Sequence, residues 1–238
     1  MTNVTEGGAD RQTVYNALEL QMLTYDDYIN IPVEPNGEPL VPLADSPYMV
    51  TTQMRAEMLP VTGTTVYVRQ TVADMLGEAS VRLAADVPGT KLRVGYGYRA
   101  LDIQKANFAR QQDRLRGTVP SVQLDAAAHR YVAKPEAAGH PAGAAVDVFM
   151  LRDGTPVDCG ADIWDFTAET YTFSPFIARQ ARDNRLRLRA AMMAVGFAPF
   201  DGEWWHYSYG DKEWARYYDR PAALYEQIEF STNTTPKV

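Results

Sequence analysis

One acidic residue, Asp147, interrupts an apolar stretch of the chain, residues 145–151. If this stretch forms a buried strand, the side-chain alternation places Asp147 on the same face as Ala145 and Phe149. Burying an ionised carboxylate without a partner costs on the order of several kcal/mol, so the fold must bring a cation to Asp147. A metal ion is one candidate, and an arginine is the other, since the chain is rich in arginine.

The composition is that of a globular protein. Hydrophobic residues make up 46% of the 238 positions and charged residues 22%, which is enough to bury a core. The net charge of -7 and the absence of a basic block argue against a nucleic-acid partner. The single cysteine, Cys159, excludes an intrachain disulfide and a multi-cysteine zinc site, and a buried thiol is expected.

Residues 1–12 are polar and are predicted to form a loose leader without the apolar segment of a signal peptide. No stretch reaches the ~18 apolar residues that a membrane span requires. We therefore expect a cytoplasmic protein with no membrane partner. Residues 30–47 contain five prolines and Asn36-Gly37, and predict an irregular arm that covers a pocket.

Periodicity predicts three helices and three strands. The helices are expected at residues 64–86, 102–116 and 174–195, and the strands at 91–98, 145–151 and 203–209. Asp102 is the predicted cap of the second helix and Ser174 that of the third, which Gly196 ends. Residues 117–139 lack a clear period. Because no regular βαβ rhythm is present, the sequence favours an α+β fold.

The chain has three histidines, and two of them lie near acidic residues. His140 precedes Asp147 by seven positions, and His206 follows Glu203 by three. On a straight strand Glu203 and His206 would face opposite sides, so a bend is needed to bring both to one site. Two imidazoles and one carboxylate make a catalytic zinc site with a position left for water, and a second carboxylate can move protons.

Structural roles for these residues are the alternative. A lone histidine near apolar residues is more often a hydrogen-bonded core residue than a metal ligand. His129 has no acidic neighbour of this kind and is interpreted as structural or as a surface residue. The aromatic residues around His206 are expected to be core residues rather than a ligand cage; they are Trp204, Trp205, Tyr207 and Tyr209.

Two motifs resemble the paired signature of the zinc D-alanyl-D-alanine peptidases. They are His140-x-x-Gly143-x-Ala145-x-Asp147 and Glu203-x-Trp205-His206, and Gly97-Tyr98-Arg99 resembles the context of the family's catalytic arginine. That fold group includes the Hedgehog signalling domain and lysostaphin-type enzymes. Residues 203–211 resemble the D-alanyl-D-alanine dipeptidase branch, the type linked to glycopeptide resistance. The resemblance covers roughly residues 67–214.

The resemblance implies a single zinc peptidase domain at residues 13–238, with a catalytic core at about 64–218 and a central, mostly antiparallel sheet flanked by helices. It implies that His140, Asp147 and His206 bind Zn²⁺. It implies that Glu203 is the general base and that Arg99 polarises the scissile carbonyl. The expected reaction is hydrolysis of D-alanyl-D-alanine, or of a similar D-amino-acid dipeptide, by a metal-activated water.

The sequence departs from the family pattern at three places. Ala138 replaces a serine that helps to hold the substrate, and Ala100 replaces a proline after the arginine. The family aspartate that holds the substrate ammonium follows a Met-Gly segment, and here residues 159–165 carry one extra residue. Asp165 is the first choice for that role and Asp162 the second.

Two other functions remain open. A D,D-carboxypeptidase or peptidoglycan endopeptidase would use the same metal site with a more open cleft. A non-catalytic zinc-binding domain is the third alternative, which the presence of both Glu203 and Arg99 disfavours. The sequence does not define an oligomeric state.

Overall fold

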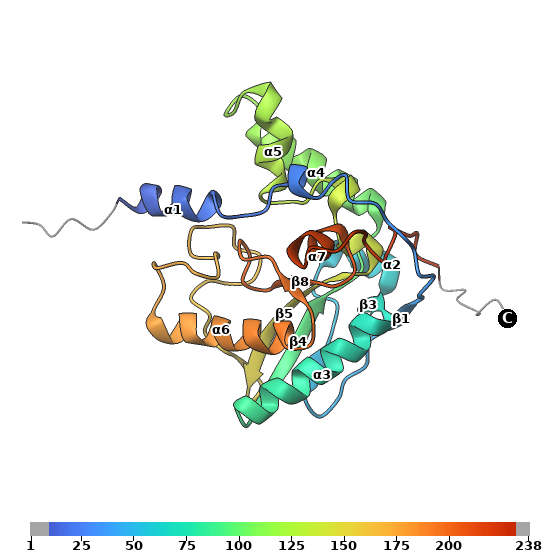
Figure 1. The fold of residues 1–238 in the computed structure, drawn as a ribbon. Coiled ribbons are helices and arrows are strands. Elements are labelled where there is room, and N and C mark those ends of the chain that lie inside the picture. Colours follow the sequence, from blue (N-terminus) through green and yellow to red (C-terminus); the bar gives the residue numbers. More distant parts are fainter. Residues whose placement is uncertain (1–9, 232–238) are drawn as a thin grey trace, which may run out of the picture.

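The computed structural model describes residues 10–231 of the chain (Figure 1). Its α-helices are α1 (Arg11–Glu19), α2 (Leu59–Thr62), α3 (Gln70–Asp86), α4 (Leu101–Leu115), α5 (Leu124–His129), α6 (Arg179–Met193) and α7 (Lys212–Tyr217). Its strands are β1 (Leu40–Pro42), β2 (Met49–Thr51), β3 (Tyr67–Arg69), β4 (Thr90–Tyr96), β5 (Ala145–Arg152), β6 (Thr155–Pro156), β7 (Ala198–Pro199) and β8 (His206–Ser208).

The strands form a central sheet and a small separate one. The central sheet has the order β2-β4-β5-β8-β7, and β6 also pairs with β5. Only β2 and β4 run parallel in it; the other pairs are antiparallel, as is the two-stranded sheet of β1 and β3. The predicted α+β class with a mostly antiparallel sheet is confirmed.

Helices α3 and α6 lie together against one face of this sheet, below it in Figure 1. Val146 and Val148 of β5 belong to the core cluster with Leu76 of α3 and Leu188 of α6, and all four are fully buried. The alternation along β5 then turns Asp147 to the opposite face, as predicted. On that face Asp147 lies close to His140 and His206.

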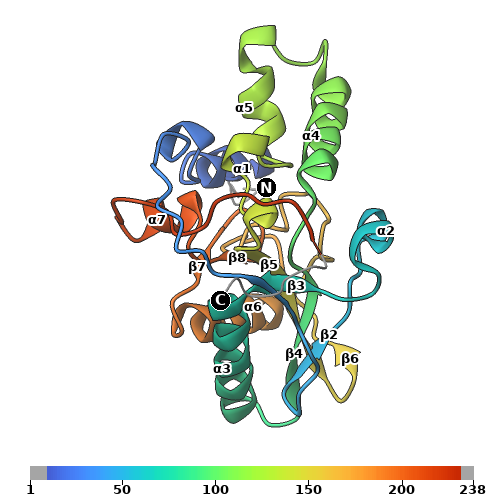
Figure 2. The same ribbon diagram turned by 90° about the vertical axis from the view of Figure 1, so that its right-hand side faces the viewer.

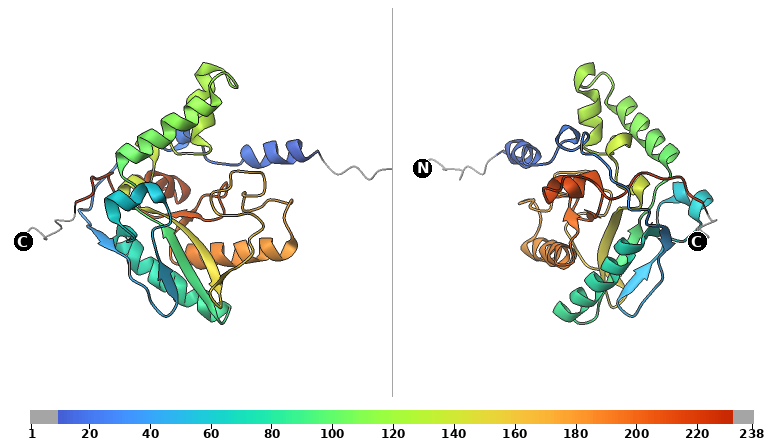
Figure 3. Two further views of the ribbon diagram at one scale, coloured as in Figure 1. Left: turned by 180° about the vertical axis from the view of Figure 1, so that it is seen from behind. Right: turned by 45° about the vertical axis from the view of Figure 1, so that its right-hand side comes forward.

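Helices α4 and α5 pack against each other and project away from the sheet, at the top of Figure 2. Helix α1 and the residues after it run beneath this projection, as the rear view in Figure 3 shows. Helix α7 packs beside β7 at one edge of the sheet (Figure 2). Among residues 10–231, no helix combines the length and apolar character needed to cross a membrane.

Two predicted helices begin in the wrong place. Within residues 64–86, Tyr67–Arg69 form β3, because they pair with β1 across the chain, and the helix α3 starts only at Gln70. The apolar spacing alone could not reveal that pairing. The helix predicted from residue 174 starts at Arg179, since Ser174 forms a buried turn in which its Oγ accepts from the backbone of Phe176.

Smaller corrections concern caps and ends. Helix α4 matches its predicted range within one residue, but Ala100 is its N-cap, and Asp102 lies in the first turn, where its carboxylate accepts from the Ile103 amide. The stretch 117–139 contains α5. The predicted end at Gly196, with φ of 104°, is confirmed. Helix α1 begins at Arg11, inside the predicted leader; the rest of that leader, residues 1–9, lies outside the described residues.

Two further predictions concern the proline-containing arm and Cys159. The arm at residues 30–47 is largely irregular and contributes only the short strand β1 and an isolated bridge at Val33. None of its residues lines the pocket at His140, Asp147 and His206, so the structure gives no support to the expected covering role. Cys159 is free and buried, as expected.

Candidate active site

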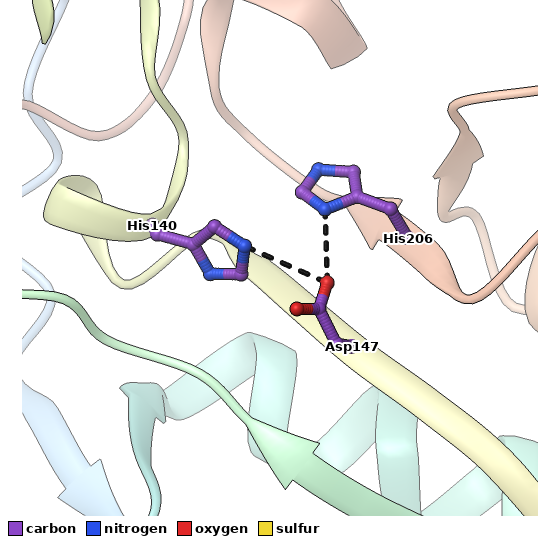
Figure 4. A group of neighbouring side chains, drawn as sticks. All are labelled: His140, Asp147 and His206. Carbon is purple, nitrogen blue, oxygen red and sulfur yellow. Dashed lines mark hydrogen bonds and ion pairs between the residues drawn. The ribbon is translucent and has the colours of Figure 1, made fainter. Parts of the chain in front are cut away.

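Three side chains that are far apart in sequence meet on the polar face of the sheet. Antiparallel pairing of β5 with β8 places Asp147 directly opposite His206. His140 comes from the 3-10 turn His140–Ala142 that leads into β5. Figure 4 shows the two imidazole rings on either side of the carboxylate, and one donor atom from each residue lies within 4.8 Å of the others.

The donor atoms of this group are oriented for a cation. Asp147 Oδ1 lies 3.0 Å from His206 Nδ1 and 3.6 Å from His140 Nε2. His140 Nδ1 donates to the Gly97 carbonyl at 2.7 Å, which leaves the lone pair of Nε2 directed at the site. Two imidazoles and one carboxylate are the ligand set of catalytic zinc, so the residues present fit this metal.

Burial and mutual charge set the protonation of the group. Burial lowers the pKa of His140 to about 4, so its ring is neutral, as a ligand must be. Burial also acts against the charge of His206, but the hydrogen bond and charge of Asp147 outweigh it and raise that pKa to about 9. Burial alone would raise the pKa of the Asp147 carboxyl. The two histidines outweigh this effect and hold that pKa well below its usual range. The side chains that contact the Asp147 carboxylate are these two histidines and Trp164, so the predicted alternative of an arginine partner is wrong.

The bend that Glu203 requires lies immediately before β8. The Glu203 amide donates to the Phe200 carbonyl at 3.0 Å, and the His206 amide donates to the Glu203 carbonyl at 2.9 Å. This turn replaces the first half of the strand predicted at 203–209 and brings Glu203 to the same pocket as His206. Burial raises the pKa of Glu203 to about 7; Asp147 adds to the rise, while His206 and Arg99 oppose it. Such a pKa suits a general base near neutral pH.

Arg99 follows β4 and is held by two neutral partners. Its Nε donates to the Tyr96 hydroxyl and its Nη1 to Gln104 Oε1, both at 2.6 Å. Its backbone amide donates to the His140 carbonyl at 3.2 Å, which couples the arginine to the histidine turn. Gly97 permits this close packing, since a Cβ there would meet the Tyr67 carbonyl oxygen at 2.5 Å. The guanidinium therefore lines the pocket in a fixed position, and it forms no salt bridge with a carboxylate of residues 10–231.

The structure does not bring Asp162 and Asp165 to the site. Both are exposed, and neither lines the pocket. They are the ends of a tight turn, in which the Asp165 amide donates to the Asp162 carbonyl at 3.2 Å. This turn directs Trp164 inward instead, with a left-handed φ of 66°. In this arrangement neither carboxylate faces the pocket, and the predicted ammonium-binding role of Asp162 or Asp165 stays a prediction from the sequence.

Several residues of the site were not predicted from the sequence. Trp164 Nε1 donates to Asp147 Oδ2 at 2.7 Å and so fixes the carboxylate oxygen that the histidines do not contact. Tyr96 and Gln104 orient Arg99, and Glu213 lines the pocket from α7. The one sequence feature that could have indicated Trp164 is its place between Asp162 and Asp165. It was not used because aromatic residues are common in protein cores. His129 is structural as expected, bonded to the Tyr28 hydroxyl and the Lys134 amide.

Replacing Trp164 with phenylalanine should weaken metal binding without unfolding the protein. The ring is largely preserved, but the hydrogen bond that orients Asp147 is lost. Loss of such an outer partner typically reduces metal affinity about 10- to 100-fold. Competition with a chromophoric chelator measures this change, and Tyr98→Phe, which removes a hydroxyl bonded to the Ile228 carbonyl, is the matched control. Unchanged affinity in Trp164→Phe would contradict the assigned role.

The cavity in front of the metal-binding group has a volume of about 220 Å³. It is smaller than the range of about 300–1,000 Å³ that is usual for drug-sized ligands. Three carboxylates line it, from Asp147, Glu203 and Glu213. Four guanidinium groups line it as well, from Arg55, Arg99, Arg110 and Arg114. The space therefore suits a small molecule that carries charges of both signs.

The chain is similar to known D-alanyl-D-alanine dipeptidases. The family model described as D-Ala-D-Ala dipeptidase matches residues 43–226. A D-alanyl-D-alanine dipeptidase from Synechocystis sp. is 29% identical over 239 residues, covering 85% of this chain and 94% of the relative. The solved VanY D,D-pentapeptidase from a VanB-type resistance cassette, in complex with Zn(II), is 19% identical, with 83% and 97% of the two chains covered and a TM-score of 0.40. The LdcB LD-carboxypeptidase is 22% identical, with 78% and 76% covered and a TM-score of 0.43. Because the family model spans most of the sequence, the chain belongs to the D-Ala-D-Ala dipeptidase family of zinc metallopeptidases.

Proposed function

We propose that this protein is a zinc dipeptidase that hydrolyses D-alanyl-D-alanine or a similar D-amino-acid dipeptide. The observation that carries the proposal is the convergence of the group His140, Asp147 and His206 with Glu203 and Arg99 in one small pocket. Membership of the D-Ala-D-Ala dipeptidase family supports the same substrate class.

We assign the metal to His140 Nε2, Asp147 Oδ1 and His206 Nδ1, the atoms that face one another across the site. When bound, zinc supplies a Lewis acid that lowers the pKa of water to about 7 and polarises a carbonyl group. The Gly97 carbonyl holds the His140 ring and the Trp164 indole holds the Asp147 carboxylate, while His206 is bonded to Asp147 itself. The donors therefore need little rearrangement to bind the ion.

Two further side chains act on the reacting atoms. The carboxylate of Glu203 accepts a proton from the attacking water and returns it to the leaving amine. Arg99, held by Tyr96 and Gln104, directs its guanidinium at the oxygen that gains negative charge. A donor fixed in this way stabilises the transition state because it needs no reorganisation during the reaction.

The charge distribution of the pocket supports a free dipeptide. Glu203 and Glu213 lie at the His206 end, while Arg110 and Arg114 come from one face of α4. Neither of these two arginines forms a salt bridge with another residue in the range 10–231. A dipeptide carries an ammonium and a carboxylate at opposite ends, which matches this separation of charges.

A hydrolysis panel tests the proposal. Zinc-loaded protein should release D-alanine from D-alanyl-D-alanine and leave the N-acetylated dipeptide and L-alanyl-L-alanine almost untouched. Faster cleavage of the N-acetylated peptide would identify a D,D-carboxypeptidase instead. Absence of turnover on every peptide, despite stoichiometric zinc, would leave a non-catalytic zinc-binding protein.

The pH dependence of kcat/KM should report the ionisation of Glu203. The base acts as a carboxylate, and burial raises its pKa to about 7, so activity is expected to rise as pH increases and to level off above this value. A bound cation lowers the pKa of a nearby carboxyl, which places the midpoint at or below 7. A profile that falls with increasing pH across this range would contradict the role of Glu203.

We also propose the cytoplasm as the location and residues 13–238 as one domain; both remain predictions from the sequence. Immunodetection after cell fractionation tests the first. Limited proteolysis tests the second, since cleavage within one domain should spare everything after the leader.

A further inference from the structure

One carboxylate in the pocket has no role in the proposed chemistry. Of the three carboxylates that line the cavity, Asp147 is assigned to the metal and Glu203 to proton transfer. The third, Glu213, is the second residue of α7 and lies on the His206 side of the cavity. Glu213 therefore faces the same cavity as His140, Asp147, Glu203 and His206.

Helix α7 holds Glu213 in place. The carboxylate of Asp211 caps the helix by accepting from the Trp214 amide at 2.8 Å, and it also accepts from Ser208 Oγ at 2.9 Å. On the other side, Lys212 Nζ donates to the Ile29 carbonyl at 2.6 Å. Asp211 and Lys212 are therefore occupied by structural contacts. Glu213, between Lys212 and Trp214, keeps its side chain for the cavity.

The carboxylate of Glu213 has no hydrogen-bond or ion partner among residues 10–231. Asp201, by contrast, is paired with Arg189 at 2.8 Å. Burial raises the pKa of Glu213 to about 8 against the opposing charge of His206. A half-buried carboxylate without a cation is unfavourable, and a positively charged group on a ligand would relieve that cost.

The segment expected to hold the substrate ammonium presents a tryptophan to the pocket. Trp164 lines the cavity and donates to Asp147, while Asp162 and Asp165 face solvent. No carboxylate from this segment is therefore available for a substrate amine. Glu213 supplies the missing negative charge from a different element, 48 positions beyond Asp165 in the chain.

We propose that Glu213 binds the α-ammonium group of the substrate and makes the enzyme selective for peptides with a free N-terminus. This inference rests on the proposed dipeptidase function and names the residue behind its specificity. The ammonium donates to the Glu213 carboxylate while the scissile carbonyl lies at the metal-binding group. The cationic face of α4 remains free for the carboxylate end of the dipeptide.

The test compares two ligands that differ only in the amine. D-Alanyl-D-alanine has the ammonium, and N-propionyl-D-alanine has a hydrogen in its place. Glu213→Gln should raise KM for the free dipeptide about 10- to 100-fold, the effect of losing a charge-assisted hydrogen bond. Its kinetics with the propionyl compound should stay unchanged. Asp165→Asn and Asp162→Asn are matched controls that should leave both ligands unaffected.

Binding provides a readout that does not require turnover. Isothermal titration calorimetry on zinc-loaded Glu203→Gln protein should show the same loss of affinity for D-alanyl-D-alanine when Glu213→Gln is added. Metal analysis of each variant confirms equal zinc content. Equal losses for both ligands would show a merely structural role and overturn the inference, as would a loss confined to Asp165→Asn. If wild-type protein binds the free dipeptide selectively but cleaves neither compound, the proposed function fails while the role of Glu213 stands.

Discussion

Glu203→Gln is expected to lower kcat on D-alanyl-D-alanine by about 10³-fold while zinc content stays unchanged. General acid–base catalysis by one positioned group contributes about 10²–10⁴-fold, and Glu203 is assigned both proton transfers of the reaction. Glutamine preserves the size of the side chain but cannot accept a proton. Because Glu203 is not among the three metal donors, the loss should appear in kcat rather than in metal affinity. Steady-state kinetics and metal analysis on the same preparation measure both quantities.

Stability provides an independent check on the same variant. The carboxyl of Glu203 has an ordinary pKa of 4.5 when exposed and about 7 in the folded protein. Its folded pKa is raised, so its ionisation destabilises the protein progressively as pH rises above 4.5, and the full penalty is present above 7. Glutamine removes this penalty, so metal-free Glu203→Gln should melt at a higher temperature than metal-free wild type at pH 8. Exposed Glu78→Gln on α3 is the control that should change neither activity nor melting. Full activity in Glu203→Gln would remove the assigned base.

Helices and strands were predicted well where the pattern that defines them lies within the element itself, and poorly where it depends on a distant segment. Helix α4 and strand β5 were located almost correctly because their apolar periods are complete within the element itself. Residues 67–69 follow a helical period equally well, yet they pair with β1 some 27 positions earlier. A contact between distant segments cannot be recognised from the residue pattern of either segment alone. The same reason explains the late start of α6 after the buried turn at Ser174.

The residues that we propose as metal ligands were predictable for a different reason. Asp147 in an apolar strand demanded a cation, and the two motifs supplied both histidines. Which side chain of residues 159–165 lines the pocket was not predictable, because one inserted position changes which side chain a turn directs inward. The turn between Asp162 and Asp165 presents Trp164, and spacing alone favoured its acidic neighbours.

Removal of zinc is expected to lower the melting temperature by about 8–16 °C. A ligand that binds only the folded state at about 1,000 times its Kd contributes about 4.1 kcal/mol. For a chain of about 150–250 residues, each kcal/mol corresponds to about 2–4 °C. The folded state has the three donors within 4.8 Å of one another, whereas unfolding separates them, so binding favours the folded state strongly. Differential scanning calorimetry with and without a chelator measures the difference.

Asp147→Asn should abolish this difference while preserving the shape of the site. The amide keeps an oxygen for the Trp164 indole, but it supplies no negative charge to the cation. Asp165→Asn, a substitution of the same chemistry at an exposed position, should retain the full shift. The negative charge of Asp147 also balances the positive charge of protonated His206, whose pKa it raises to about 9. The metal-free variant should therefore melt lower than metal-free wild type at pH 7, where that histidine is charged in the wild type. A zinc-dependent shift of equal size in Asp147→Asn would show that the ion binds elsewhere, and the assignment of the catalytic centre would fall with it.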